Sequence, residues 1–215
     1  MSERIPLFPL GTVLYPGQPL PLHIFENRYR QLVRTLLDLP PERREFGVLA
    51  IREGREVGTD GVRALHDVGC AARLERVADL PDGRFDILTV GTRRFALEAV
   101  DGSLAYLQGD VRWVPESGGE ATVVAPGVRR LFVGYRDAVL GPTGPEPPDD
   151  PRALSYHAAA TMVLDLADHQ ALLAAPDDGA RLRTLATLLR RERAVLRALP
   201  SLPGTDYARV AVSPN

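Results

Sequence analysis

The sequence contains no lysine, and this absence excludes several kinds of catalytic site. All 26 basic residues of the 215-residue chain are arginine. A P-loop needs a lysine that reaches the phosphates of a nucleotide, and a Ser-Lys dyad needs a lysine as its base. A Schiff base with a carbonyl substrate likewise requires the lysine amine. We therefore predict neither ATP hydrolysis nor proteolysis by this chain.

Cysteine and long apolar runs are also scarce. Cys70 is the single cysteine, so no disulfide can form within the chain, as is typical of proteins from reducing compartments. Prolines interrupt every apolar stretch near the N-terminus, which therefore lacks the apolar run of a signal peptide. The longest apolar runs are far shorter than the ~20 residues that a membrane-spanning helix needs. We expect a cytoplasmic protein with no membrane span.

Residues that bind metals or act as nucleophiles do not gather in the sequence. Zinc ligands cluster at short spacings, but the histidines here are scattered and Cys70 has no Cys-X-X-Cys partner. The run Ser155-Tyr-His157 and the aspartates near it form no recognisable catalytic triad. We therefore predict no metal, no cofactor and no catalytic residue. The histidines are His23, His66, His157 and His169.

What the chain does contain is typical of a folded, soluble protein. Apolar residues make up 45% of it, charged residues 25%, and the formal net charge is −2. A chain of this length buries roughly 70% of the surface that its unfolded form exposes, so it needs no disulfide or metal to hold a core. Its length is compatible with one or two domains.

The first forty or so residues change from a proline-rich pattern to a helical one. Prolines at close intervals permit edge strands and tight turns but not a central strand. We predict extended segments at Ile5–Leu10 and Leu20–Ile24 around a turn at Tyr15–Gly17. Apolar residues then recur at helical spacing, which predicts a helix over about Glu26–Leu39 that the next two prolines end.

The middle of the chain has the pattern of short strands. Asp82-Gly83 is a hairpin signal between two of them. Strands that follow one another at spacings of about ten residues, joined by tight turns, are typical of a small barrel or sandwich. The predicted strands are Phe46–Ile51, Val68–Val77, Phe85–Val90, Arg94–Val100 and Tyr106–Val114.

Beyond a polar connection at Pro115–Glu120, the apolar period becomes helical. Asp150 is a candidate N-cap, with Pro151 just inside the helix that it begins. The leucines of the last helix follow the period of a buried face, so we expect them in the core. The predicted helices are one around Val128–Val139, then Ala153–Ala167, Asp168–Ala174, and one from Asp178 to about Leu199.

This change of period divides the chain into two parts and a tail. The division is a β-rich part over residues 1–118, a helical part over residues 119–200, and a loosely held tail over residues 201–215. The predicted fold class is α+β, with one early helix inside the β-rich part.

Several runs of residues occur in an order that is known from one protein family. They are Ile5-Pro-Leu-Phe-Pro-Leu10, Val13-Leu-Tyr-Pro-Gly17, Pro21-Leu-His-Ile-Phe-Glu26 and Arg28-Tyr29, with further matches at Phe46-Gly-Val48, Val57-Gly-Thr59, Asp82-Gly-Arg84 and Val90–Phe95. In these runs the chain resembles the N-terminal substrate-binding domain of Lon proteases. The resemblance covers nearly the whole chain and implies an N-terminal PUA-like β-barrel followed by a C-terminal helical bundle.

The same resemblance implies a function. In Lon, this domain recognises polypeptide substrates and precedes an ATPase and a peptidase, whereas the present sequence ends after the helical part. We therefore expect a non-catalytic module that binds unfolded or tagged polypeptide and has a protease as a further partner.

The start of the first helix carries the side chains that we assign to peptide binding. They are Phe25, Asn27, Arg28 and Gln31. An apolar ring, side-chain amides and a guanidinium within two turns can hold both the side chains and the backbone of an extended peptide. The alternative reading is structural: Glu26 or Asn27 caps the helix, and Arg28 binds backbone carbonyls or a carboxylate. We expect Asn27 and Gln31 to be exposed.

RNA binding is the alternative function, because PUA-like barrels elsewhere bind RNA and arginine suits that role. A pI near 6.1 and acids interspersed among the arginines argue against it, since phosphate neutralisation dominates nucleic-acid affinity. A hydrolase would need a nucleophile beside a base, and no such constellation is recognisable. Polypeptide binding is therefore the leading hypothesis.

Overall fold

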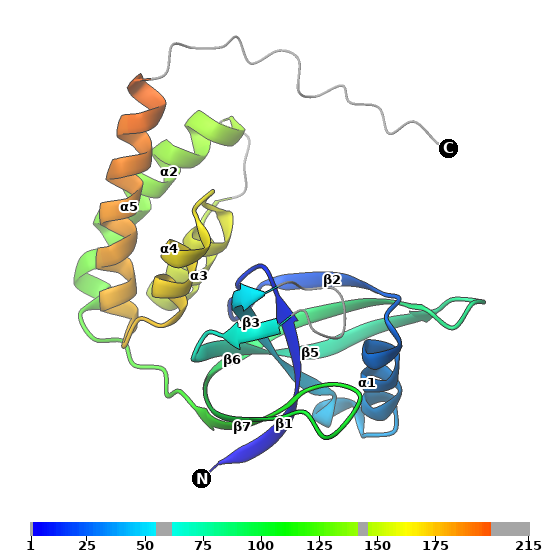
Figure 1. The fold of residues 1–215 in the computed structure, drawn as a ribbon. Coiled ribbons are helices and arrows are strands. Elements are labelled where there is room, and N and C mark those ends of the chain that lie inside the picture. Colours follow the sequence, from blue (N-terminus) through cyan, green and yellow to red (C-terminus); the bar gives the residue numbers. More distant parts are fainter. Residues whose placement is uncertain (1, 55–61, 142–145, 199–215) are drawn as a thin grey trace.

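The structure, a computed structural model, describes residues 2–54, 62–141 and 146–198. The predicted tail and the match at Val57–Thr59 lie outside these residues. The strands are β1 (Glu3–Leu10), β2 (Pro19–Ile24), β3 (Glu45–Gly54), β4 (Val62–Leu65), β5 (Val68–Asp79), β6 (Phe85–Asp101) and β7 (Gln108–Trp113). The helices are α1 (Asn27–Leu37), α2 (Ala121–Leu140), α3 (Pro151–Thr161), α4 (Leu166–Leu173) and α5 (Asp178–Ala198), with a 3-10 turn at Pro41–Arg43 (Figure 1).

The strands form a mostly antiparallel sheet whose hydrogen-bonded path returns to its first strand. The order is β1-β7-β6-β5-β3-β4, and β1 pairs with both β7 and β3. The β1–β3 pair is parallel, and the other pairs are antiparallel. β1 makes both pairings because its residues 3–6 lie beside β7 while its residues 7–10 lie beside β3.

β6 is longer than the sequence indicates. The sequence predicts two strands, Phe85–Val90 and Arg94–Val100, whereas β6 runs unbroken through both. Its first half pairs with β2 and its second half with β7, while β5 pairs along both halves. Gly91 lies between the two predicted strands and is part of β6. The predicted hairpin at Asp82-Gly83 is confirmed, since it joins β5 to β6.

The loop between β1 and β2 is held against β6 at Gly91. Within the loop, the Gln18 amide donates to the Tyr15 carbonyl at 3.1 Å and Gly17 has a φ of +80°, which confirms the predicted turn. The Gly17 amide donates to the Gly91 carbonyl at 2.8 Å, and the Gly91 amide donates to the Gln18 carbonyl at 2.9 Å. A Cβ at Gly91 would overlap the Tyr15 oxygen, so only glycine permits this approach.

Gly91→Ala is expected to lower the free energy of unfolding by about 1–3 kcal/mol, because the added methyl group pushes the loop away from β6. Gly127 of α2 is the matched control, since a Cβ there would meet no atom of the described residues outside its own helix within 4 Å. Gly127→Ala should raise the stability by about 0.5–1 kcal/mol through helix propensity. Chemical denaturation measures both effects, and equal stabilities of the two variants would contradict the close approach at Gly91.

The helices of the second half follow the predicted periodicity, with one correction. The sequence predicts two helices, Ala153–Ala167 and Asp168–Ala174, where the structure has α3 ending at Thr161 and α4 beginning at Leu166. The carboxylate of Asp165 accepts a hydrogen bond from the Asp168 amide at 2.8 Å, and this cap begins a new helix. The predicted cap of α3 is confirmed, because the Asp150 carboxylate accepts from the Ala153 amide at 2.8 Å.

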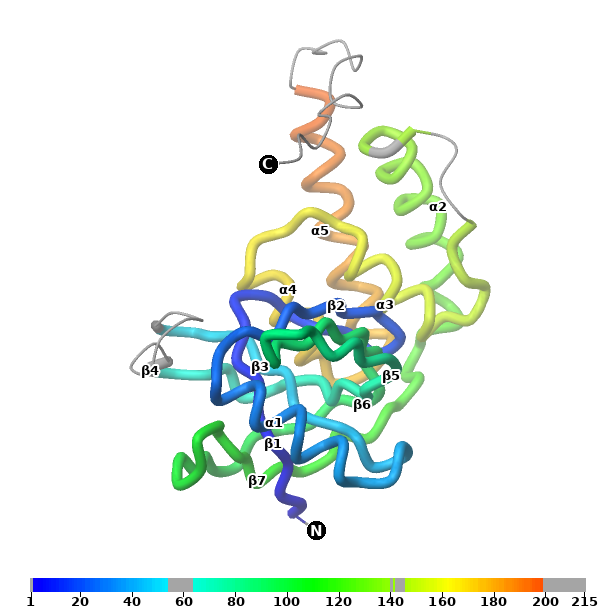
Figure 2. The backbone as a smooth tube through the Cα atoms, turned by 90° about the vertical axis from the view of Figure 1, so that its right-hand side faces the viewer, coloured from blue at the N-terminus to red at the C-terminus, as the bar shows by residue number. Residues whose placement is uncertain are grey.

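One apolar core joins the strands to the helices. It contains Tyr15 and Phe46 from the strand part together with Phe132 and Leu185 from the later helices. In Figures 1 and 2, α3 and α4 lie between the strands and the pair formed by α2 and α5. The division of the chain at residue 118 therefore stays a prediction. A second, smaller cluster contains Ile5, Leu7, Leu49, Phe95 and Val111.

A buried arginine of β6 also connects the two parts. The side chain of Arg94 is 1% exposed and binds the Glu116 carboxylate with two nitrogens, Nε at 2.8 Å and Nη2 at 3.3 Å. Its third nitrogen donates to the carbonyls of Leu173 and Ala175 at 2.7 and 2.6 Å. A single guanidinium therefore ties β6 to the connection before α2 and to the end of α4.

Arg181 of α5 is the second buried arginine at this junction. Its Nη1 lies 2.8 Å from the Asp178 carboxylate and donates to the Ser155 hydroxyl, and its Cζ lies 4.0 Å from the ring centroid of Tyr156. The Tyr156 hydroxyl donates to Glu116 at 2.8 Å, which connects the two arginine sites. Burial raises the pKa of Tyr156, so this hydroxyl stays protonated at neutral pH.

Candidate functional site

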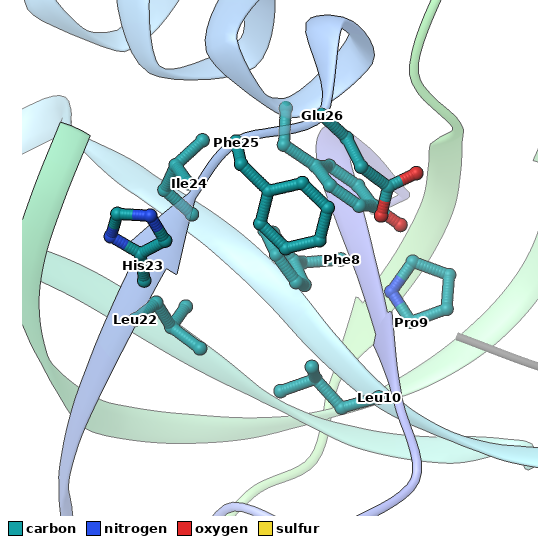
Figure 3. Close-up of a pocket in the computed structure, with 9 residues that line it drawn as sticks. Phe8, Pro9, Leu10, Leu22, His23, Ile24, Phe25 and Glu26 are labelled. Carbon is teal, nitrogen blue, oxygen red and sulfur yellow. The ribbon is translucent and has the colours of Figure 1, made fainter. Parts of the chain in front are cut away.

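An apolar cavity of about 150 Å³ lies between β1, β2 and the start of α1 (Figure 3). Among the described strands, β1 pairs with β7 and β3 while β2 pairs with β6, so the two strands that wall the cavity do not pair with each other. The cavity between the two strands is therefore lined by side chains of both. The lining residues are Phe8, Pro9, Leu10, Leu22, His23, Ile24, Phe25, Glu26 and Tyr29.

Two phenylalanines line this cavity in different ways. Phe8 is 6% exposed and stacks on Tyr29, with 4.0 Å between the ring centroids. Phe25 is 52% exposed, and Figure 3 shows its ring next to Phe8 between the two strands. Full burial of such a side chain contributes about 1.5–3 kcal/mol. Much of that free energy is still available to a ligand that covers Phe25.

Prolines determine the character of the wall that β2 provides. In the antiparallel pair with β6, the backbone groups of alternate β2 residues point toward β6 or toward the free edge. Pro19 and Pro21 occupy alternate positions and have no N–H group, so the ladder keeps its donors while the free edge loses two of its own. Such an edge resists the addition of another strand. A ligand at this wall is therefore held mainly through its side chains.

Charged groups surround the cavity beside His23. Its Nδ1 lies 2.6 Å from Oδ1 of Asp86, and its Nε2 lies 3.2 Å from Nη1 of Arg84. The His23 ring is 6.2 Å from the Phe25 ring, at an interplanar angle of 27°. The cavity thus has an apolar interior and a polar rim, which is the arrangement of a protein-binding surface.

The start of α1 forms another part of the rim. Glu26 occupies the N-cap position, but its side chain makes no capping hydrogen bond. Its carboxylate instead lies 3.0 Å from Nη2 of Arg28, whose Cζ is 4.5 Å from the ring centroid of Tyr29. The expectation that Glu26 caps the helix is therefore wrong. Arg28 is held by groups of its own chain, as the structural reading of the sequence expects.

Of the four residues that the sequence analysis assigns to peptide binding, Phe25 lines the cavity, and Asn27, Arg28 and Gln31 lie outside it. Asn27 and Gln31 are exposed, as expected, and lie one turn apart on α1. The Asn27 side-chain oxygen accepts a hydrogen bond from Nη1 of Arg30 at 3.1 Å. The structure therefore separates the predicted set into a cavity residue, two exposed amides and an internally bound arginine.

Most of the residues that line the cavity carry no recognisable signal in the sequence. Phe8 and Leu22 are placed in strands by their pattern, with no sign that the two strands face each other across a gap. The prolines carry the available signal, because they predict edge strands, and two neighbouring edges that do not pair leave room between them. The lining residues missed are Phe8, Pro9, Leu10, Leu22, His23, Ile24, Glu26 and Tyr29.

Other candidate chemistry is absent from the part of the chain that the structure describes. No group of three or more His, Cys, Asp or Glu side chains there is placed to hold a metal ion. Burial raises the pKa of Cys70, which keeps its thiol protonated and unreactive at neutral pH. Burial also lowers the pKa of His157 and His169, whose rings pack against Phe132 and Tyr15. None of the described helices is both long and apolar enough to cross a membrane.

Solved structures with similar architecture define the class of this fold. The Lon N-terminal domain protein from Xanthomonas campestris is 26% identical and has a TM-score of 0.62, over 86% of this chain and 98% of that chain. The N-terminal domain of a Mycobacterium avium complex Lon protease has a TM-score of 0.65 over 87% of this chain and 98% of that chain. Its identity of 19% limits that likeness to the fold. The fold is that of a Lon N-terminal domain, with a mostly antiparallel sheet and five helices among the described residues.

Sequence relatives narrow this class to a family. Lon protease 1 of Herpetosiphon aurantiacus is 26% identical over 209 residues, which cover 92% of this chain and 25% of that protein. Lon protease of Escherichia coli strain K12 is 27% identical over 204 residues, covering 89% of this chain and 25% of that protein. The chain thus spans a quarter of the length of these curated relatives. Residues 4–191 match the ATP-dependent protease La (LON) substrate-binding domain, and the chain belongs to this family.

Proposed function

We propose that this chain is a non-catalytic module that binds unfolded polypeptide and that the cavity between β1 and β2 receives an apolar side chain of the ligand. The half-exposed ring of Phe25 beside this cavity is the observation that carries the proposal. An apolar cavity with exposed aromatic surface and a polar rim is a typical binding site. Unfolded polypeptides present the large apolar side chains that folded proteins keep inside.

The size of the cavity favours weak and general recognition. Burial of one apolar side chain contributes about 1.5–3 kcal/mol, whereas a Kd of about 1 μM needs about 8 kcal/mol. Contacts outside the cavity must supply the difference. The exposed amides of Asn27 and Gln31 lie on the adjoining helix and are suited to hydrogen bonds with an extended backbone. The ligand is then selected by its exposed apolar residues and by little else.

The family supports binding over catalysis, because the domain it describes is a substrate-binding one. We infer that the partner is a protease that receives the bound polypeptide. We further infer that the closed path of strand pairing is a small PUA-like barrel and that α2 to α5 form a helical bundle. Both inferences extend the likeness to Lon N-terminal domains.

Phe25→Ala is expected to raise the Kd for an unfolded, cysteine-alkylated test protein by about fivefold to tenfold, because the ligand loses the aromatic wall of the cavity. The melting temperature should hardly change, since exposed side chains contribute under about 0.5 kcal/mol. In a second arm, Asn27→Glu with Gln31→Glu should also weaken binding without loss of stability. Fluorescence anisotropy titrations and thermal melts measure the two quantities.

Val123→Ala is the matched control, because Val123 is an 80% exposed apolar side chain on α2, away from the cavity. It should leave the affinity unchanged. Equal affinities of the wild type and Phe25→Ala would remove the cavity from the proposal. A large fall in the melting temperature of the double glutamate variant would instead assign Asn27 and Gln31 a structural role.

A further inference from the structure

Three arginines on the last turns of α5 lack a carboxylate partner among the described residues. Arg190, Arg193 and Arg197 recur at three- and four-residue steps, so they share one side of the helix. Arg190 donates only to a carbonyl of its own helix, that of Ala186 at 3.3 Å. By contrast, Arg183 lies 3.0 Å from a carboxylate oxygen of Glu120. The end of α5 therefore presents guanidinium groups that a ligand can bind.

These arginines border a groove between α2 and α5. The two helices lie side by side, and a Cβ at Gly134 of α2 would be 3.4 Å from Cζ of Arg193. Figures 1 and 2 show this end of the helix pair pointing away from the strands. A cavity of about 260 Å³ lies there, lined by Leu131, Arg190, Arg193, Ala194 and Arg197.

We propose that this groove docks an acidic amphipathic helix from a partner polypeptide. Carboxylates that recur at three- and four-residue steps along such a helix would match the spacing of the three arginines. Each arginine can bind a carboxylate with two parallel hydrogen bonds. One apolar side chain between the carboxylates would enter the cavity against Leu131 and Ala194.

The charges around the groove favour a polypeptide over a nucleic acid. The three arginines span seven residues of helix, or about 10 Å at a rise of 1.5 Å per residue. Glu192 stands between Arg190 and Arg193 in the sequence and lies 2.9 Å from Arg191, so negative charge also occurs within this short stretch. Nucleic-acid affinity depends on neutralising many phosphates along an extended basic surface. A short row of cations beside an apolar cavity suits one face of an acidic helix.

This surface lies on α2 and α5, whereas the cavity of the proposed function lies between β1 and β2. The docking site is therefore independent of polypeptide binding at Phe25. If the experiments contradict one of these two binding sites, the other still stands. Phe25→Ala should leave the binding of an acidic helix unchanged.

The test uses the whole chain and a synthetic helical peptide that carries glutamates at the spacing of the arginines and one leucine between them. Changing Arg190, Arg193 and Arg197 together to glutamine should weaken the binding of this peptide about tenfold or more, since three exposed ion pairs are lost. A peptide of the same composition in scrambled order should bind the wild type equally weakly. Isothermal titration calorimetry at low and at physiological salt measures both.

The matched control removes the same charge elsewhere. Arg43, Arg52 and Arg76 are exposed and have no carboxylate partner in the described part of the chain. Changing these three to glutamine should leave the affinity within about twofold. Ala194→Trp fills the cavity without a change of charge. It should weaken the binding of the peptide as strongly as the loss of the three arginines does. This variant tests the groove even if the triple arginine variant fails to fold.

The proposal is overturned if the control variant loses as much affinity as the groove variant, or if Ala194→Trp binds the peptide as the wild type does. It is also overturned if the scrambled peptide binds as tightly as the peptide whose glutamates match the arginine spacing. The binding would then depend on net charge alone and not on the position of the carboxylates. If a single-stranded RNA of equal net charge binds more tightly than the peptide, the ligand of this groove is a nucleic acid and not an acidic helix.

Discussion

Replacing Arg94 with alanine is expected to lower the free energy of unfolding by about 3–5 kcal/mol, a large part of the stability of an ordinary domain. The guanidinium is buried and satisfies the Glu116 carboxylate and the carbonyls of Leu173 and Ala175. Without it, a half-buried carboxylate loses its closest cation, and two carbonyls at the end of α4 lose their donor. Polar groups left unsatisfied in this way cost more than an intact hydrogen bond contributes.

Arg93 provides a matched control, because it is the preceding residue of the same strand. Its side chain is 48% exposed, lies 3.4 Å from Glu45, and stacks on Trp113 with Cζ 3.4 Å from the ring centroid. Arg93→Ala should cost about 1 kcal/mol, the usual value for an exposed ion pair and cation–π contact. Urea denaturation followed by far-UV circular dichroism compares the variants. Equal losses for Arg93→Ala and Arg94→Ala would show that apolar packing alone holds the junction.

This pair of arginines shows where sequence reasoning stops. Arg93 and Arg94 are adjacent and identical, and both belong to β6, although the predicted strand begins only at Arg94. Alternation predicts that they face opposite sides of the strand. It does not predict which side lies under α4, because the partner groups come from residues about 80 positions further along the chain. Long-range packing therefore decides which of the two arginines connects β6 to the end of α4.

Local signals predict most of the elements. The Tyr15–Gly17 turn, the Asp82-Gly83 hairpin and the Asp150 cap are confirmed because each depends on a few neighbouring residues. The predicted boundary between two helices at Ala167 and Asp168 is wrong for a similar reason. Asp165 is a good N-cap in the middle of an apolar period, and the cap outweighs the periodicity.

The candidate site is predicted less well than the fold. Phe25 is recognised because it joins an extended segment to a helix, and its exposure supports that reading. The cavity itself depends on β1 and β2 lying beside each other without pairing, which no periodicity of either strand expresses. Glu26 and Arg28 bind each other across two residues, so a pair that suggests ligand contacts in the sequence is occupied within the chain.

Phe8, a buried lining residue of the cavity, is expected to control stability, in contrast to the exposed ring of Phe25. Phe8→Ala should lower the free energy of unfolding by about 3–5 kcal/mol, as truncation of a buried phenylalanine does. The loss includes the stacking contact with Tyr29, at 4.0 Å, and the tilted contact with Phe46, at 5.7 Å between ring centroids. Urea denaturation measures this change directly.

Phe8→Leu separates the two roles of the cavity. Leucine keeps an apolar floor and should cost under about 1.5 kcal/mol, so the protein stays folded under binding conditions. Its affinity for the unfolded test protein should remain within about threefold of the wild type, whereas Phe25→Ala weakens it more and leaves the stability unchanged. If Phe8→Ala destabilises the protein no more than Phe25→Ala does, the stack on Tyr29 is not part of the core. The cavity would then be a flexible surface feature, and its shape could not select a ligand.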